Sequence, residues 1–338
     1  MSWHREKQME IRIISFTRSG SQLADRVRKT LEEQGHSCRA EKWQKGMSLS
    51  DWTRDCWKEK QGLVFIGAAG IAVRAIAPFL KDKFTDPAVI AMDEKGRFAI
   101  PLASGHMGGA NELAEVLGRE LHAIPVITTA TDVNYLFAVD VFARENGLYL
   151  SDRELAKQVS ARLLEGDSIG WQADWGGFPA PEGFVLPGLE TKDCLTVWIT
   201  LSDQKRANYL KLIPRAVIIG TGCRKGTSGE ALSRAVDQML KQHHISPHAV
   251  LGVATIDIKE QEPAITELVK MRGWKLFSYT AEELGRVEGE FSESEFVKRT
   301  VGVGNVCERA AACSGAEIIA KKTLFSGITV SLGVVERR

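Results

Sequence analysis

The sequence lacks cysteine pairs of the C-x-x-C type, long apolar runs and an excess of charge of either sign. Its 6 cysteines are scattered, so we expect reduced thiols, as in a cytoplasmic protein, and no zinc or iron–sulfur site. The N-terminal residues are too charged for a secretory signal peptide, and no apolar run reaches the length of a membrane span. A net charge of +1 gives no global basic field for nucleic acid. These absences favour a cytoplasmic protein without membrane or nucleic-acid partners.

The composition that remains is that of a globular α/β protein with more than one domain. Of the 338 residues, 44% are hydrophobic and 26% are charged, which is ordinary for a folded chain. The length exceeds what one typical core holds. We divide the chain into an N-terminal α/β domain (residues 1–137), an irregular middle region (138–214) whose segment 170–188 is rich in Gly, Pro and Trp, and a separate C-terminal α/β domain (215–338).

Residues 62–134 carry the clearest pattern. Apolar runs at 63–66, 88–92 and 124–127 each end in a loop of Gly, Asp, Ser or Thr, and the segments between them are expected to be helical. Continuous apolar runs of this length are typical of the buried parallel strands of a doubly wound sheet. Ligands of such sheets bind beyond the carboxyl ends of the strands, so we expect the polar loops to meet at one edge.

Two of these loops are candidate binding sites. Small residues between Gly67 and Gly70 would let backbone N–H groups approach an anion at the start of a helix. The loop at residues 104–112 places a hydroxyl, an imidazole, an amide and a carboxylate beside flexible glycines. Both loops can also be read as ordinary strand-to-helix turns. The polar residues 128–134, which follow the third apolar run, are likewise either a site or a tight turn.

A second Gly-rich loop opens the C-terminal domain. Residues 220–230 follow an apolar run, contain two adjacent cations and precede an amphipathic segment, which predicts a cradle for a carboxylate or phosphate. Thr227 and Glu230 have the spacing of a capping box. The order of a P-loop is absent. His243, His244 and His248 lie in a helix-to-strand connection, and we do not expect them to bind a metal.

Long motifs at both ends of the chain carry a resemblance to a known family. They are GAAGIAVRAIAP, KFTDPAVIAMDEKGRFAIPLASGHMGGANELA and PVITTATDVN in the first half, and GTGCRKGTSGEAL, ATIDIKEQEPAI, FSESEFVKRTVGVGNVCERAA and ITVSLGVV in the second. On these motifs the chain resembles the cobalt-precorrin-5A hydrolase (CbiG) family of anaerobic cobalamin biosynthesis. Its second half is similar to the C-terminal domain of that family, which also occurs as a separate small protein in aerobic pathways.

The resemblance implies a reaction. Members of the family open the δ-lactone of cobalt-precorrin-5A and release acetaldehyde, giving cobalt-precorrin-5B. The cobalt arrives with the tetrapyrrole substrate, so the resemblance implies no cofactor and no metal site of the protein's own. It also implies handover of the substrate and product to neighbouring enzymes of the pathway.

We map this chemistry onto the loops as a hypothesis. His106 is the first choice for general base or acid, and Glu112 would orient or replace it. Ser104, with the N–H groups of Gly108 and Gly109, would stabilise the oxyanion. Asp132 and Asn134 would complete the site from the next strand end.

The remaining candidates would bind the carboxylates of the flat, polyacidic substrate. They are Gly67, Gly70, Arg74, Thr129, Gly222, Arg224, Lys225, Thr227 and Lys259. For each cation, a solvated surface charge is the alternative. For the whole chain, one alternative is a non-catalytic tetrapyrrole-binding or handover module. Another is a protein that binds or isomerises sugar phosphates, which would not explain the motifs shared at both ends.

Overall fold

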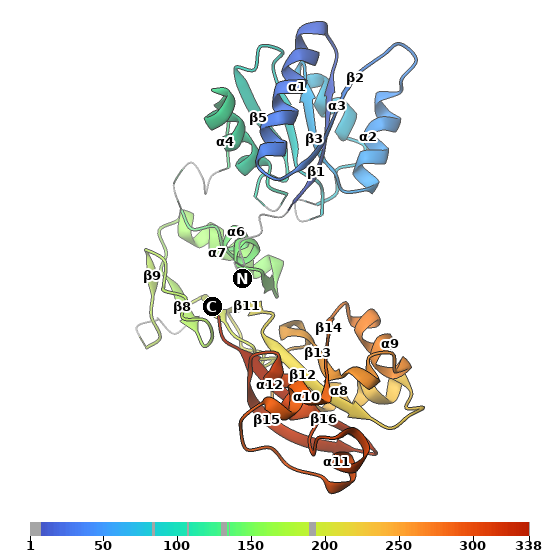
Figure 1. The fold of residues 1–338 in the computed structure, drawn as a ribbon. Coiled ribbons are helices and arrows are strands. Elements are labelled where there is room, and N and C mark those ends of the chain that lie inside the picture. The colour runs from blue at the N-terminus through green and yellow to red at the C-terminus, as the bar shows by residue number, and fades with distance from the viewer. Residues whose placement is uncertain are drawn as a thin grey trace. The chain divides into compact units, whose positions relative to one another are not determined.

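The computed structural model describes residues 8–82, 85–106, 108–129, 134, 136–188 and 194–337. The chain forms two compact units, which we call the N-terminal unit (Met1–Glu145) and the C-terminal unit (Asn146–Arg338). Figure 1 shows their helices and strands in the order of the chain. Within the described ranges, no helix combines the length and the apolar character needed to cross a membrane.

The N-terminal unit is built on a 6-stranded sheet in the order β2-β1-β3-β4-β5-β6. Its strands are β1 (Glu10–Ser15), β2 (Ser37–Lys42), β3 (Gly62–Ile66), β4 (Val89–Met92), β5 (Phe98–Ala103) and β6 (Ile124–Pro125). β1 to β4 pair in parallel, and β3 and β4 are buried throughout. The predicted apolar runs at 63–66 and 88–92 therefore form the centre of the sheet. The run at 124–127 was wrongly expected to be a buried strand, because it supplies β6, an exposed strand of two residues at the edge.

Helices cover both faces of this sheet (Figure 1). On one face, α1 (Arg18–Glu33) and α4 (Ala110–Leu121) share a core with Ile11 and Ile13 of β1. On the other, α2 (Leu49–Lys58) and α3 (Ala69–Ile76) pack around Ile14 and Phe65. The alternation along β1 sends successive side chains to opposite faces. The predicted doubly wound α/β architecture is confirmed.

β5 is a strand that the sequence analysis did not predict, and it reverses the direction of the chain in the sheet. Residues 98–103 were not expected to form a strand, yet β5 pairs antiparallel to β4, with Ala103 opposite Val89. β6 runs parallel to β5. The loops that follow β5 and β6 therefore lie at the amino-terminal edge of β1 to β4, opposite the loop that follows β3. The expectation that all of these loops meet at one edge was wrong, because it assumed an all-parallel sheet.

The middle region is more regular than its composition indicated. A 5-stranded sheet runs in the order β7-β11-β10-β8-β9, and α7 (Arg153–Leu164) packs against it. Its strands are β7 (Leu148–Leu150), β8 (Ile169–Ala173), β9 (Phe184–Val185), β10 (Thr196–Ile199) and β11 (Tyr209–Pro214). Trp171 and Trp198 are buried within these strands, so the indoles build a core rather than mark a loop.

The C-terminal sheet has 5 strands in the order β14-β13-β12-β16-β15. Its strands are β12 (Val217–Cys223), β13 (Val250–Ile256), β14 (Lys275–Tyr279), β15 (Ala316–Phe325) and β16 (Ile328–Val335). α8 (Gly229–Gln242) and α9 (Pro263–Arg272) pack on one face. The other face carries α10 (Ala281–Arg286), α11 (Glu295–Val301) and α12 (Cys307–Cys313). The α/β class predicted for this part of the chain is confirmed.

Candidate functional site

The loop between β5 and α4, residues 104–109, is the most unusual segment of the N-terminal unit. Ser104 has a φ of 52° and Gly109 a φ of 85°, so the chain is left-handed at both ends of the loop. A Cβ on Gly108 would lie 2.5 Å from the Cβ of Ser104, and one on Gly105 would lie 2.6 Å from Oδ1 of Asn111. Glycine at these two positions allows the loop to fold tightly against its own polar side chains.

His106 lies in this loop with a carboxylate beside it. Its Nδ1 is 3.7 Å from Oδ1 of Asp140, and the two side chains are 12% and 8% exposed. Asp140 belongs to α6 (Val139–Glu145), which is part of the N-terminal unit. A carboxylate at this distance from an imidazole in a buried setting stabilises the protonated form of the ring. His106 is therefore placed to accept and hold a proton.

Arg144, one turn further along α6, ties the loop to α4. It donates to the backbone carbonyl of His106, and its Nη2 lies 3.1 Å from Oε2 of Glu112. Sequence reasoning placed Glu112 beside the imidazole. In the structure Glu112 pairs with Arg144, and Asp140 is the carboxylate that faces His106.

Ser104 keeps a buried hydroxyl without a hydrogen-bond partner in the described structure. The residue is 7% exposed, and its Oγ is buried. Most buried polar side-chain atoms in proteins are paired, so an unpaired one needs an explanation. The N–H of Gly109 donates to the carbonyl of His106 at 3.2 Å. It is therefore engaged within the loop, which weakens its predicted role as an oxyanion donor.

The loop after β6 joins this site, as its direction requires. Nδ2 of Asn111 donates to Oγ1 of Thr129 at 3.3 Å, so residues that follow β5 and β6 meet at one edge of the sheet. Asn134 is exposed. Asp132, predicted as a catalytic residue, lies outside the described residues.

The predicted anion loop after β3 lies at the opposite edge of the sheet. Gly67 packs against the ring of Phe16, since a Cβ on residue 67 would lie 2.8 Å from that ring. The guanidinium of Arg74 lies over Gly70, 3.7 Å from the place of a Cβ there. Because β5 is reversed, Gly67, Gly70 and Arg74 are not brought together with His106.

The predicted cradle of the C-terminal unit is filled by a carboxylate of the chain itself. The N–H of Gly226 donates to Oε1 of Glu262 at 3.2 Å, and Nζ of Lys259 lies 2.7 Å from Oε2. The hydrogen bond from Lys259 holds the pKa of Glu262 below its usual value. The carboxylate that Gly226 contacts is that of Glu262, and binding of a substrate carboxylate by this loop stays a prediction.

Other predicted members of this cradle serve the local structure. Thr227 donates to the carbonyl of Arg224 at 2.7 Å. The N-cap of α8 is Ser228, whose side chain accepts from the N–H of Ala231, so the predicted capping box at Thr227 and Glu230 was wrong. Gly222 lies at the end of β12, beside Thr329. Lys225 contributes to lowering the pKa of Glu262.

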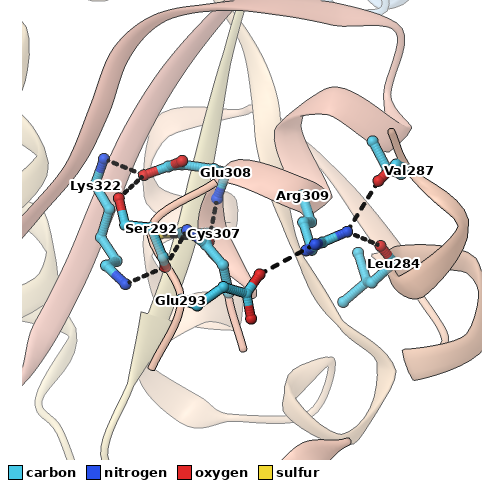
Figure 2. Close-up of polar contacts among 9 residues, drawn as sticks. Leu284, Val287, Ser292, Glu293, Cys307, Glu308, Arg309 and Lys322 are labelled. Carbon is cyan, nitrogen blue, oxygen red and sulfur yellow. Dashed lines mark hydrogen bonds and ion pairs between the residues drawn. The ribbon is translucent and has the colours of Figure 1, made fainter. Parts of the chain in front are cut away.

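A second polar cluster in the C-terminal unit was not predicted (Figure 2). Glu308, on α12, is 1% exposed and accepts from Oγ of Ser292 at 3.2 Å and from the backbone N–H of Lys322 at 2.7 Å. The adjacent Arg309 donates to the carbonyls of Leu284 and Val287. The two neighbouring side chains hold the segment after α10 against the sheet. Because Glu308 is enclosed, we assign it to structure rather than to substrate contact.

A metal centre has no support within the described ranges, where no group of three or more His, Cys, Asp or Glu side chains could hold an ion.

Comparisons with known proteins cover nearly the whole chain. Residues 51–132 match the family model "Cobalamin synthesis G N-terminal", residues 137–214 match "Cobalamin biosynthesis central region", and residues 217–333 match "Cobalamin synthesis G C-terminus". The loop of His106 thus falls in the first model and α6 in the second.

Two curated relatives show the same likeness. The cobalt-precorrin-5A hydrolase of Salmonella typhimurium is 36% identical over 300 residues, with 85% of each chain covered. That of Priestia megaterium is 32% identical over 297 residues, covering 81% of this chain and 79% of the relative.

Among solved structures, a cobalamin biosynthesis protein G homologue from Sulfolobus solfataricus is 20% identical, covers 97% of each chain and has a TM-score of 0.42. CobE, a protein of the cobalamin biosynthetic pathway, is 27% identical, covers 37% of this chain and 95% of its own, and has a TM-score of 0.35. The family models and the curated relatives confirm the resemblance, and the chain belongs to the cobalt-precorrin-5A hydrolase (CbiG) family of cobalamin biosynthesis.

Proposed function

We propose that the protein hydrolyses the δ-lactone of cobalt-precorrin-5A, releases acetaldehyde and forms cobalt-precorrin-5B, with His106 as its general base. Relatives of that name cover most of the chain, which supports the substrate. One structural observation carries the site: the imidazole of His106 lies beside the buried carboxylate of Asp140, in a strained loop at a sheet edge. This arrangement is suited to taking a proton from water.

The first step is lactone opening. His106 takes a proton from water as the water oxygen bonds to the lactone carbonyl carbon. The ring C–O bond then breaks, and the departing alkoxide receives the proton back from the imidazolium. The products are a carboxylate and a secondary alcohol that bears the methyl group. Both proton transfers need one group that titrates near neutral pH, and imidazole is the side chain suited to this.

The second step releases the two-carbon unit. The alcohol gives up its proton to the imidazole of His106, which the first step has returned to its neutral form, as its oxygen becomes the carbonyl of acetaldehyde. The carbon–carbon bond to the macrocycle breaks, and its electron pair passes into the conjugated system of the macrocycle, which then takes up a proton. The cobalt belongs to the substrate, and we propose that the protein adds no cofactor of its own.

Ser104 is the side chain that we propose as donor to the oxyanion. Ser104 has a hydroxyl that no other described group uses, but its Oγ is buried. It would reach the lactone carbonyl only after the 104–109 loop shifts on binding. Of the catalytic candidates, we therefore place His106 first and Ser104 second.

Binding of the polyacidic macrocycle needs cations that are not already engaged. Arg224 has no ion pair in the described parts of the chain, so we propose that it binds a substrate carboxylate within the C-terminal unit. Arg74 also has none there, but it lies at the sheet edge opposite His106, so we do not place it beside the reacting lactone. Lys259 is paired with Glu262 and would bind substrate only by exchange. We also propose that substrate and product pass directly between neighbouring enzymes of the pathway, because such intermediates are unstable.

A turnover assay tests the proposal. Purified protein is incubated with cobalt-precorrin-5A, and acetaldehyde and the mass of the corrinoid are followed. We expect turnover in the wild type and a loss of about 10²- to 10⁴-fold in His106→Ala. His122→Ala, at an exposed histidine that ends α4, is the matched control and should be unaffected. Near-normal turnover in His106→Ala would remove the role of His106. Tight binding without acetaldehyde in the wild type would favour the carrier function.

A further inference from the structure

We propose that α6 supplies the positioning residues of the catalytic site: Asp140 orients the ring of His106, and Arg144 fixes the loop that carries it. The proposal rests on the proposed role of His106. It adds two residues that lie outside the match to the N-terminal family model, which ends at residue 132. Both belong to the region matched by the central model, 137–214. The site would then be assembled from two sequence modules that fold into one compact unit.

Asp140 acts on the imidazole through Nδ1. Its Oδ1 is 3.7 Å from Nδ1 of His106, and both side chains are almost fully enclosed. A carboxylate on that side favours the tautomer that carries its proton on Nδ1. The lone pair of the ring is then on Nε2, which we propose takes a proton from water. The separation exceeds a hydrogen bond, and such contacts in unliganded sites often shorten when substrate binds.

Asp140 also has a local role that must be separated from this one. Its Oδ1 accepts from the N–H of Val141 at 3.0 Å, at the first turn of α6. Asparagine serves about as well as aspartate at helix N-termini. A purely local role would therefore survive Asp140→Asn, whereas the role toward His106 would not, because the amide is uncharged and can present N–H to Nδ1.

Arg144 holds the loop at two points. One Nη donates to the carbonyl of His106, and the other lies 3.1 Å from Glu112 at the start of α4. Glu145 lies 3.8 Å from the same guanidinium. The two carboxylates offset the charge of Arg144. Arg144 would fix where the ring lies, and Asp140 which ring nitrogen carries the proton.

The contacts of Arg144 argue against a role for this residue in substrate binding. The side chain of Arg144 is 23% exposed, and its guanidinium is shared between a backbone carbonyl and two carboxylates. A lysine keeps the charge but cannot span two separated acceptors with a planar fork. Arg144→Lys should consequently lower kcat while KM changes little, because the loop loosens and the substrate contacts remain.

The test compares full-length Asp140→Asn, Arg144→Lys and a control, Glu115→Gln, which removes an exposed carboxylate on α4. We expect kcat/KM to fall 10²-fold or more in Asp140→Asn, with the acidic limb of its pH profile moved to lower pH. The ¹⁵N NMR signals of His106, recorded without substrate, should show its proton moving from Nδ1 toward Nε2. Glu115→Gln should match the wild type in all three measurements.

Two outcomes separate this inference from the proposed function. If the wild type turns over and Asp140→Asn keeps the wild-type rate, pH profile and tautomer, the positioning role of Asp140 is overturned. If the tautomer shifts in Asp140→Asn but the wild type releases no acetaldehyde, the positioning role stands and the proposed reaction fails. Asp140→Glu is a further check, because partial recovery of the pH profile supports an electrostatic role and no recovery alongside normal folding contradicts it.

Discussion

Ser104 combines two features that cost stability. Its backbone is left-handed, which costs a residue other than glycine roughly 1–2 kcal/mol. Its hydroxyl is buried without a partner. Features of this kind are kept where surrounding structure and function require them. Glycine would fit the backbone better, so the presence of serine argues that its hydroxyl is used.

Ser104→Gly should therefore separate stability from activity. We expect the variant to be more stable by about 1 kcal/mol, because the left-handed strain is relieved, and to turn over more slowly, because the hydroxyl is lost. Chemical denaturation and the acetaldehyde assay measure the two effects. Ser326→Gly is the matched control, since Ser326 also has a left-handed backbone, at φ 48°, but is exposed in the turn before β16. It should gain stability without losing turnover. A less stable Ser104→Gly with full activity would contradict the interpretation.

The sequence predicted those site residues that are recognisable from the composition of a single loop. His106, Ser104 and Thr129 are polar residues in Gly- or Thr-rich turns after apolar runs, and the structure gathers them at one edge. Asp140 and Arg144 could not be found in this way, because their role depends on contact with a loop more than 30 residues earlier. The available signal was their i, i+4 spacing on one helix face, which is common in solvated helices.

At the scale of elements, one unrecognised strand changed the geometry of the predicted site. β5 reads FAIPLA, an apolar run that contains a proline, and proline is disfavoured inside sheets. The turn before it, residues 93–97, is marked by Asp and Gly. A hairpin there reverses the chain and places the following loop at the other edge. Loop composition predicted which loops matter, but strand direction decided which of them meet.

The loop between β12 and α8 also shows what loop composition can and cannot predict. Its glycines and cations did predict a carboxylate site, and the carboxylate proved to be Glu262. Composition describes what a loop attracts. It does not say whether the group that binds there comes from solution or from the chain itself, here from Glu262 at the start of α9.

Glu262→Gln should lower the folding stability of the protein by an amount that depends on pH. The hydrogen bond from Lys259 lowers the pKa of Glu262 in the folded state. The carboxylate therefore stabilises the fold above its ordinary pKa of about 4.5, and this contribution is lost as the pH falls through the folded-state value. We expect the variant to have a lower denaturation midpoint at pH 7 and a smaller further loss in acid than the wild type. Denaturation midpoints measured from neutral to acidic pH test this.

Glu230→Gln provides the comparison for that experiment, because Glu230 has an 84% exposed side chain in the same region. Its curve should follow the wild type throughout. Parallel curves for Glu262→Gln and the wild type across the acid range would show that the carboxylate contributes nothing specific to the fold.

At the scale of the whole molecule, the three sheets were only partly foreseen. The sheets formed by the first and last thirds of the chain were expected, because several of their strands are continuously apolar. The middle sheet was missed because its strands are short, down to the two residues of β9, and because Gly- and Pro-rich loops separate them. Short strands leave too few residues for a period to show. The pairing that makes them a sheet comes from partners distant in sequence.

The two compact units each bury a core of their own, so a substitution that destabilises one unit should affect mainly that unit. Glu308→Ala is such a substitution in the C-terminal unit. It removes the buried carboxylate that accepts from Oγ of Ser292 and from the N–H of Lys322. We expect the free energy of unfolding to fall by about 2–4 kcal/mol, because two hydrogen bonds are lost and the truncated side chain leaves a cavity. Amide hydrogen exchange followed by mass spectrometry should show faster exchange in residues 281–335, beginning with the segment between α10 and α12.

The same experiment shows whether the units share one folding transition. Peptides from residues 10–121 should exchange as in the wild type if the N-terminal unit is stabilised by its own core alone. Glu317→Ala, at an exposed position on β15, is the control and should leave both units unchanged. If the N-terminal peptides in Glu308→Ala accelerate together with those of the C-terminal unit, the chain folds as one cooperative body. His106 would then depend on the C-terminal core for its stability, and substitutions there would lower turnover without touching the site.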